Sequence, residues 1–130
     1  MDEIRSYLYG GTEGLHDART MRDMEKAVSI ITDKIKQGKQ IRIIGDYDID
    51  GVSATYILLK GLRRVGACAS VKIPDRMKDG YGINEHLILR AKEDGVDTIL
   101  TCDNGIAALD AIAYAKKEGM TVVVTDHHDI

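Results

Sequence analysis

Four short apolar runs alternate with helical patterns from residue 41 onwards, and this alternation limits the possible folds more than any other feature of the sequence. The runs at 41–44, 67–73, 98–102 and 120–125 have the length and β-branched content of strands, and helical spacing fills 52–65, 84–94 and 105–118. A helix that joins two strands of one sheet leaves them parallel. The sequence therefore predicts an α/β fold, with a parallel sheet of about four to five strands and helices on both faces.

A further helix is expected ahead of the first strand. Its apolar residues lie three or four positions apart and form one stripe, made by Met24, Val28, Ile31 and Ile35. Gly38 follows the stripe and is typical of the residue just after a helix end. We therefore predict an amphipathic N-terminal helix that docks through this stripe.

The chain is long enough for one hydrophobic core. It has 130 residues, of which 44% are hydrophobic, and this favours a single compact domain. Residues 1–16 are polar, glycine-rich and aperiodic, so we expect a loosely held lead-in segment there and one domain over 17–130. The chain stops at Ile130, within a polar cluster directly after the last expected strand, and we therefore expect the domain to be truncated.

The charge balance argues against a surface that coats DNA. The net charge is −3 and the pI is about 5.8, so any contact with nucleic acid must be local. Cys68 and Cys102 lack the spacing of a metal site and lie in apolar runs, which favours buried reduced thiols in a cytoplasmic protein. No apolar run approaches the roughly 20 residues that cross a bilayer, so no membrane contact is expected.

Acidic or imidazole side chains follow every expected strand; Asp75 follows the second strand, and clusters follow the other three. The clusters are Asp46, Asp48 and Asp50 after the first strand, Asp103 and Asn104 after the third, and Asp126, His127 and His128 after the fourth. Ligands of parallel sheets bind beyond the carboxyl ends of the strands, where these residues would meet. An Asp after a strand can also be simply the N-cap of the next helix, and this alternative stays open for Asp50 and Asp103 taken singly.

Taken together, the three clusters predict a metal centre, because crowded carboxylates repel one another unless a cation lies between them. Imidazole beside carboxylates, without thiolate ligands, favours Mn²⁺, with Mg²⁺ as the alternative. The carboxylates exceed the needs of one ion, so two ions are expected, as in enzymes that transfer a phosphoryl group to water. Asp103 is the candidate for the bridging ligand.

Other phosphate chemistries fit the sequence less well. An aspartyl-phosphate mechanism also uses two Asp residues two positions apart after a strand, but Gly51 and Val52 are a poor match for the residues that usually follow. No G-x-G-x-x-G lies between the first strand and its helix, and no G-x-x-x-x-G-K-[ST] is present. Dinucleotide and P-loop sites are thereby excluded.

Four ordered motifs resemble those of DHH-family phosphoesterases of the RecJ branch. They are GDYDIDG at 45–51, IPDRMKDGYGIN at 73–84, TCDNGI at 101–106 and VVTDHHDI at 123–130, and LHDARTMRDMEKAV at 15–28 resembles the lead-in helix of that branch. The resemblance implies a hydrolase that uses Mn²⁺ or Mg²⁺ to remove nucleotides from the 5′ end of single-stranded DNA during DNA repair and recombination.

The resemblance also implies metal-binding and catalytic roles. Asp48, Asp50, Asp103 and His127 match the catalytic metal ligands of the family, and Asp46 is expected to assist the first metal. His128 matches a histidine that faces the scissile phosphate. Asp126 is expected to support these ligands from behind without itself binding metal.

Substrate contacts are implied for a second group of residues. These are Arg76, Gly80, Tyr81, Gly82 and Asn104, together with His128. The motif at 73–84 matches a segment that lies over the active site in the family. Single-stranded nucleic acid is therefore the expected partner.

The sequence also departs from the family pattern. The family has a further metal-binding Asp downstream, a second domain with a glycine-rich motif, and in RecJ enzymes a nucleic-acid-binding module, and none of these occurs in the 130 residues. We therefore expect this chain alone to be weakly active or inactive. Two alternatives stay open, namely a DHH phosphoesterase for small oligonucleotides, cyclic dinucleotides or pyrophosphate, and a non-catalytic DHH scaffold.

Overall fold

Helices and strands alternate along the computed structural model, which describes residues 2–75, 77 and 82–129. The strands are β1 (Gln40–Ile44), β2 (Cys68–Lys72), β3 (Thr98–Cys102) and β4 (Thr121–Thr125). The α-helices are α1 (Asp2–Tyr9), α2 (Met24–Lys36), α3 (Ile49–Arg64), α4 (Glu85–Glu93) and α5 (Leu109–Lys117), and short 3₁₀ helices lie at Thr12–Gly14 and Ala18–Thr20. The predicted order of strands and helices from residue 41 onwards is confirmed.

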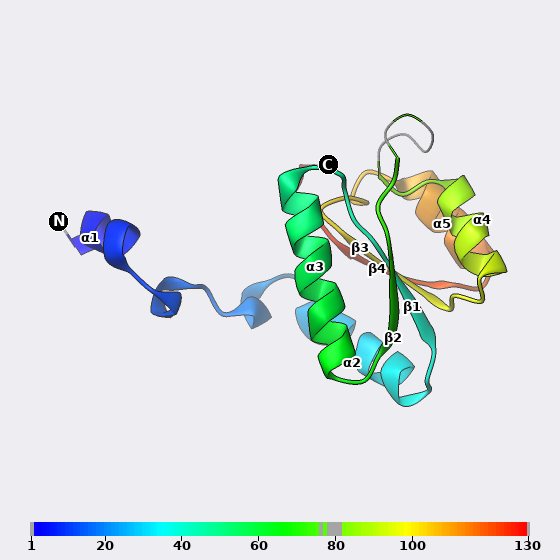
Figure 1. Ribbon diagram of the computed structural model, residues 1–130, viewed down its shortest axis with the longest axis horizontal. Coiled ribbons are helices and arrows are strands. Elements are labelled where there is room, and N and C mark those ends of the chain that lie inside the picture. The colour runs from blue at the N-terminus through cyan, green and yellow to red at the C-terminus, as the bar shows by residue number, and fades with distance from the viewer. Residues whose placement is uncertain (1, 76, 78–81, 130) are drawn as a thin grey trace. The chain divides into compact units, whose positions relative to one another are not determined.

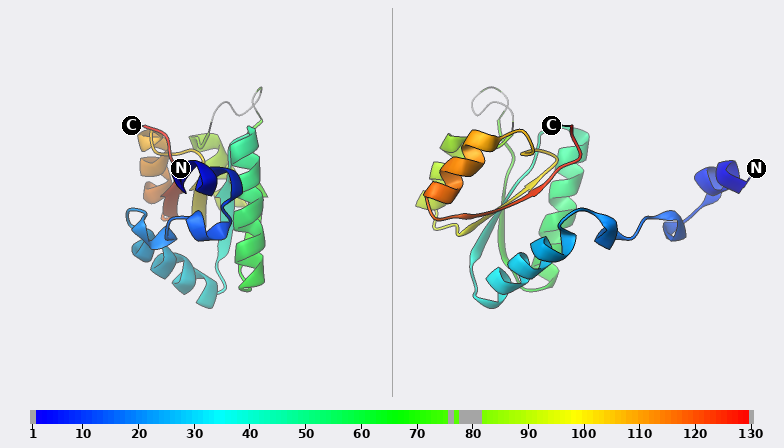
Figure 2. Two further views of the ribbon diagram at one scale, coloured as in Figure 1. Left: turned by 90° about the vertical axis from the view of Figure 1, so that its left-hand side faces the viewer. Right: turned by 180° about the vertical axis from the view of Figure 1, so that it is seen from behind.

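The strands form one parallel sheet in the order β2-β1-β3-β4. In its middle, Ile43 of β1 pairs with Val71 of β2 and Leu100 of β3, and Leu100 in turn pairs with Val123 of β4. Every residue of the interior strand β3 is buried. Helix α3 covers one face of the sheet, and α4 and α5 cover the other (Figures 1 and 2). The predicted fold class is therefore confirmed.

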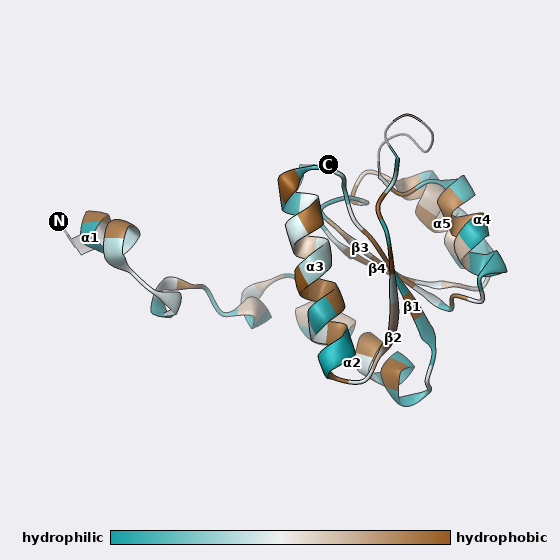
Figure 3. Ribbon diagram, viewed as in Figure 1, coloured by the Kyte–Doolittle hydropathy of each residue, from teal (hydrophilic) through white to brown (hydrophobic). Residues whose placement is uncertain are grey.

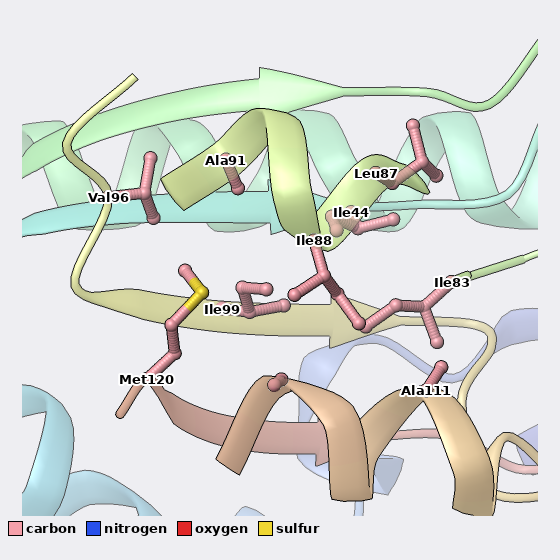
Figure 4. Close-up of a cluster of buried hydrophobic side chains, with 10 residues drawn as sticks. Ile44, Ile83, Leu87, Ile88, Ala91, Val96, Ile99, Ala111 and Met120 are labelled. Atoms are coloured by element: carbon pink, nitrogen blue, oxygen red, sulfur yellow. The ribbon is translucent and has the colours of Figure 1, made fainter. Parts of the chain in front are cut away.

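A hydrophobic core cluster fills the space between the sheet and the pair α4 and α5 (Figure 4). Ile44 and Ile99 reach it from β1 and β3, and Ile88 reaches it from α4; all three have 0% exposed surface. Burying one such side chain stabilises the fold by about 1.5–3 kcal/mol relative to leaving it in water. The cluster thereby fixes the ends of β1 and β3, from which the polar loops of interest depart.

The chain divides into two units, residues 1–30 and 31–130. The first unit contains α1, for which the sequence analysis predicted no regular element. Its apolar residues Ile4, Tyr7 and Leu8 have helical spacing but are exposed, so the helix has no buried stripe to reveal it over so short a length. Helix α2 forms as predicted, although none of its residues is fully buried.

Helix α3 exposes several hydrophobic side chains. Ile49, Val52, Tyr56 and Ile57 are all exposed, and hydrophobic and hydrophilic residues alternate along its ribbon (Figure 3). The helix nevertheless buries Thr55 and Leu62. Exposed apolar side chains on one helix are common in folded proteins and do not by themselves define a binding site.

The two cysteines differ in exposure. Cys102 at the end of β3 is buried, but Cys68 at the start of the edge strand β2 is exposed, so the expectation of two buried thiols was wrong for Cys68. An apolar sequence run does not show whether its strand lies at the edge or in the middle of a sheet. Among the helices that the structure describes, none combines the length and hydropathy needed to span a bilayer.

Candidate metal centre

The polar loops meet where the direction of the chain connections reverses. From β1 the chain crosses to β2 on one side, and from β3 it crosses to β4 on the other, while β1 and β3 are neighbours. The carboxyl ends of two such neighbouring strands are the usual place for a ligand in parallel sheets, and the loops after β1 and β3 begin there. The loop after β4 joins them from the adjacent position.

The loop after β1 is packed closely onto the start of α3. A Cβ atom added to Gly45 would lie 1.9 Å from Oγ1 of Thr55, and one added to Gly51 would lie 2.6 Å from the carbonyl oxygen of Asp46. Only glycine fits such close approaches. The GDYDIDG motif is therefore a compact turn, which holds Asp46 in a position that is 2% exposed.

Alternate residues of an extended chain point to the same side, but the three carboxylates of this motif do not lie on an extended chain. Asp48 is the N-cap of α3, and its Oδ1 accepts a hydrogen bond of 2.8 Å from the backbone N–H of Gly51. Asp50 is exposed in the first turn of the helix. The N-cap alternative left open for Asp50 is therefore wrong, because the cap is Asp48.

Asp103 follows directly after the end of β3 and is buried. Its backbone has a φ of 61°, a left-handed conformation that costs little for Asp, and its N–H donates to the carbonyl of Thr125 at 3.0 Å. Oδ1 lies 2.8 Å from Nε2 of His127. Oδ2 is buried and has no hydrogen-bond partner among the described residues. This buried, half-satisfied carboxylate is the main feature of the site.

The surroundings of Asp103 disfavour its negative charge. Burial raises the pKa of the Asp103 carboxyl above its ordinary value, and the negative charge of Asp48 raises it further. The hydrogen bond from His127 and the charges of both histidines lower the pKa only in part. A positive charge next to Oδ2 would relieve this cost.

Two groups of potential ligand atoms meet at Asp103. In one, Asp46, Asp48 and Asp103 each offer an oxygen, and in the other Asp103 is joined by His127 and His128; within each group the ligand atoms lie no more than 4.8 Å apart. The Asp103 carboxylate has two oxygens and belongs to both groups. Asp50 belongs to neither, so the structure brings together five of the residues that we predicted around the metals, but not this one.

The donor set fits the expected metals. Carboxylate oxygens suit Mg²⁺ and Mn²⁺, and imidazole nitrogen beside them favours Mn²⁺. The orphaned Oδ2 of Asp103 is the strongest sign of a missing partner, because a buried charged atom without one is costly. The described residues therefore fit a divalent metal centre with Asp103 as the shared ligand.

Asp126 holds the two histidines in place. Its side chain is 2% exposed and accepts hydrogen bonds from the backbone N–H groups of Ile106, His127 and His128 at 2.9, 2.8 and 3.2 Å. A further contact of 2.6 Å joins its Oδ1 to Nδ1 of His128. Burial raises the pKa of Asp126, but these hydrogen bonds outweigh it and leave the pKa below its ordinary value.

The contact with Asp126 orients His128. The hydrogen bond to Asp126 raises the pKa of the His128 imidazole, with its charge as a further contribution. Because Nδ1 donates to Asp126, the second nitrogen Nε2 remains available for another ligand. The rings of His127 and His128 lie 4.7 Å apart between centroids, so both reach the same region.

Asn104 has a different environment from the one that we expected of a substrate-binding residue. It is 1% exposed, and Nδ2 donates to the backbone carbonyls of Ile44 and Cys102, each at 3.0 Å. Oδ1 accepts from the backbone N–H of Ile83 at 3.2 Å. The side chain thus joins the ends of β1 and β3 to the segment before α4, and its polar atoms are already paired.

Part of the predicted substrate segment lies outside the described residues. This applies to Arg76, Gly80 and Tyr81. Gly82 is described, with a φ of 63° that favours glycine, and an added Cβ would lie 3.5 Å from the side chain of Asn104. It therefore lies directly against the Asn104 side chain.

Thr55 was missed by the sequence analysis. Its hydroxyl lies 3.3 Å from Sγ of Cys102, beneath Gly45, and joins α3 to the end of β3. A Thr inside a helical pattern gives no signal of such a role. A glycine directly before the first Asp was the available hint, because it implies a close neighbour.

A parallel sheet with carboxylates and histidines at the reversal of its connections defines an α/β protein with a candidate divalent-metal centre. Residues 40–130 match the model of the DHH family, N-terminal domain. Because this match covers more than half of the sequence, the chain belongs to the DHH family.

Two curated relatives, both named single-stranded-DNA-specific exonuclease RecJ, match most of this chain. It is 39% identical over 128 residues to the single-stranded-DNA-specific exonuclease RecJ of Bacillus subtilis, which covers 98% of this chain but 16% of that protein. It is 33% identical over 118 residues to the enzyme of that name from Escherichia coli, covering 89% of this chain and 20% of that protein. The chain thus spans less than a quarter of the length of these relatives.

Solved structures agree with the fold. A crystal structure of exonuclease RecJ bound to manganese matches 84% of this chain and 28% of that chain, with a TM-score of 0.77 and 35% identity. RecJ of Thermus thermophilus in complex with Mn²⁺ matches 85% of this chain and 15% of that chain, with a TM-score of 0.69 and 32% identity. The chain is therefore similar to RecJ-type DHH proteins in sequence and in fold.

Proposed function

We propose that residues 17–130 belong to a DHH catalytic domain and form most of a metal centre that hydrolyses phosphodiester bonds of single-stranded DNA, starting from the 5′ end. The single observation that carries this proposal is the position of Asp103, which joins two groups of ligand atoms and has an unpaired buried oxygen. The names of the relatives support single-stranded DNA as the substrate. We further propose Mn²⁺ as the natural metal, Mg²⁺ as its substitute, and two ions per site.

The proposed ligands follow from the two groups. Asp46 and Asp48 share one group with Asp103, and His127 shares the other, so Asp103 is the residue that would serve two ions as a common ligand. We also propose Asp50 as a metal ligand. Its side chain is outside both groups, so it would have to approach the metal from the first turn of α3. Its substitution is therefore part of the test.

Divalent ions bound here would lower the pKa of a water molecule and offset the charge of the phosphate oxygens. The protein side chains would place the reacting groups. His128 donates Nδ1–H to Asp126, and this contact raises the pKa of its ring; in the protonated form, Nε2–H would be offered to a phosphate oxygen as negative charge develops on it. The turn at 45–51 keeps Asp46 and Asp48 fixed before substrate binds, which lowers the cost of organising the site.

The alternatives have less support. A non-catalytic scaffold would not need a buried carboxylate with a raised pKa, and Asp48, Asp103 and His127 are all in place. Small nucleotides or pyrophosphate as substrates are less favoured, because the RecJ relatives are named for single-stranded DNA. Since this chain spans 16% to 20% of these relatives, we expect it to cleave DNA slowly by itself. A cytoplasmic location stays a prediction.

Titration with Mn²⁺ tests the metal centre directly. We expect heat of binding and a thermal shift that stabilises the fold by ~2.7 kcal/mol at a hundredfold excess over the dissociation constant. Substituting alanine for Asp46, Asp48, Asp50 or His127 should weaken Mn²⁺ binding if the residue is a ligand. Of these variants and His128→Ala, His128→Ala should weaken Mn²⁺ binding least. No heat and no thermal shift with the unaltered chain would disprove the proposed site.

Hydrolysis is tested with single-stranded DNA labelled at its 5′ end. We expect slow, Mn²⁺-dependent release of the labelled nucleotide, and its loss in the His128→Ala variant even at saturating Mn²⁺. Duplex DNA of the same sequence is the matched control. Preferred cleavage of the duplex, or cuts at internal positions, would contradict the proposed exonuclease.

A further inference from the structure

A cavity of about 270 Å³ opens beside the metal centre. Its walls include Ile83, the turn at residues 105–108 and His128. Ile106, Ala107 and Ala108 give the turn an apolar surface, and each is at least partly exposed. The cavity is thus a mostly apolar hollow that a ligand from solvent can enter.

His128 connects this cavity to the metal centre. Its ring nitrogen belongs to the group of ligand atoms around Asp103, and the same side chain lines the cavity. A phosphate held at the metal centre would therefore have the cavity as a direct neighbour. Whatever is attached to that phosphate can extend into it.

The charges around the cavity do not suit a phosphate. Its described lining contains no Lys or Arg, and the carboxylates of Asp126 and Asp129 border it. A second cavity of about 450 Å³ continues from Ile83, Ala107 and Ala108, and it carries the acidic residues Glu85 and Asp110. Apart from His128 at the metal centre, a DNA backbone that ran along these two cavities would meet four carboxylates and, among the described residues, no Lys or Arg.

We infer that the cavity beside His128 takes the base of the nucleotide whose phosphate lies at the metal centre, so that the uncharged end of the nucleotide enters the apolar hollow. This inference rests on the proposed function. The volume is near the lower end of the roughly 300–1,000 Å³ of small-molecule pockets, which suits one nucleoside and not two. Apart from His128, the described lining has no aromatic ring, so contact is through aliphatic groups and backbone and accepts any base.

Product binding to the full 130-residue chain tests this inference. In the presence of Mn²⁺, the dissociation constants of dAMP, dTMP and 2-deoxyribose 5-phosphate are measured by calorimetry. Removing the base should weaken binding about tenfold, because the base would no longer bury its surface against the apolar wall. Equal affinity for dAMP and for deoxyribose phosphate overturns the inference, as does failure of all three to bind while Mn²⁺ itself binds.

A pair of variants locates the effect. Ala107→Leu places a larger side chain at the exposed rim of the cavity and should remove the preference for dAMP, whereas Ala113→Leu adds the same atoms to an exposed position of α5. Mn²⁺ affinity should be unchanged in both variants. An unchanged preference in Ala107→Leu overturns the inference, and an equal loss in Ala113→Leu does so too. Failure of Mn²⁺ binding in the unaltered chain would instead contradict the proposed function.

Discussion

Oδ1 of Asp103 lies 2.8 Å from Nε2 of His127, while Oδ2 of the same carboxylate is buried without a hydrogen-bond partner among the described residues. One oxygen is thus satisfied by the protein and the other is not. A site built for metal accepts such a cost, because the ion supplies the missing partner. Without metal, the same carboxylate should destabilise the fold.

The first prediction is that Asp103→Asn stabilises the metal-free chain at pH 7 but abolishes its response to Mn²⁺. Burial, followed by the charge of Asp48, raises the pKa of Asp103 above 3.8. An Asp whose pKa is raised by folding costs stability as the pH rises through its unfolded value, and the cost is complete above the folded value. The gain should therefore be present at pH 7 and absent at pH 3, as measured by thermal unfolding with a chelator.

With Mn²⁺ present, the unaltered chain should instead be more stable than Asp103→Asn. Asp103→Asn removes a charge from a ligand shared by both groups, so affinity should fall by more than the roughly 10- to 100-fold that follows loss of an outer-shell partner. Asp97→Asn, before β3 at the opposite edge of the sheet, should bind Mn²⁺ normally. Equal Mn²⁺ affinity of Asp103→Asn and the unaltered chain would show that Asp103 is not a ligand.

The second prediction concerns acid stability at that opposite edge. Burial raises the pKa of Asp97, but hydrogen bonds from Lys34, 2.6 Å away, and from Thr98 outweigh this and leave the pKa below 3.8. A lowered pKa gives stability that is present above pH 3.8 and lost as the pH falls through the folded value. Asp97→Asn should cost about 1 kcal/mol at pH 7, since the pair is partly exposed.

Urea unfolding at a series of pH values checks this. The difference between Asp97→Asn and the unaltered chain should shrink as the pH falls below 3.8. Asp33→Asn, on the exposed side of α2, is the matched control and should differ little at any pH. A constant difference from pH 7 to pH 2 would mean that the ion pair does not contribute.

The third prediction is that Gly45→Ala destabilises the chain severely and that Thr55→Ala in the same molecule restores part of the loss. The added Cβ would lie 1.9 Å from Oγ1 of Thr55, and the second substitution removes that oxygen. Thr55→Ala alone should cost about 1 kcal/mol, because Cys102 loses its hydrogen-bond partner. Denaturant unfolding of the two single variants and the double variant measures the coupling free energy between the two substitutions. Additive losses would show that the clash is relieved in another way.

Much of the fold could be predicted from the sequence, because β-branched runs and helical spacing have different periods. The strand order could not, because pattern alone does not say that β3 returns to the other side of β1. Helix α1 was missed for lack of a buried stripe. The exposure of Cys68 was misjudged for a related reason, since position in the sheet depends on contacts far along the chain.

The location of the site could be predicted from the sequence better than the arrangement of its side chains. The carboxyl ends of parallel strands meet at one edge, so Asp46, Asp103 and His127 were expected together and lie together. The alternate spacing of the first motif was misleading, because the chain leaves the extended conformation after Ile44 and begins a helix at Ile49. A compact turn places Asp48 as the N-cap and Asp50 in the first turn of α3, outside both groups, which no count of residues reveals.

The last prediction is that Asn104 acts through the backbone and not through contact with substrate. Its side chain pairs with the carbonyls of Ile44 and Cys102 and with the N–H of Ile83. Asn104→Ala would remove these three hydrogen bonds to buried backbone, so it should cost about 3 kcal/mol of unfolding free energy. Because Cys102 precedes the left-handed Asp103, the variant should also weaken Mn²⁺ binding.

Two further variants separate this role from a general loss of stability. Asn84→Ala removes the N-cap of α4 and should cost about 1 kcal/mol while leaving Mn²⁺ affinity intact. Asn104→Asp keeps the shape but cannot donate to two carbonyls when ionised, so its stability should recover in part as acid protonates the new carboxyl. If Asn104→Ala kept full stability and Mn²⁺ affinity, the buried amide would have no positioning role, and contact with substrate would again be the better explanation for this residue.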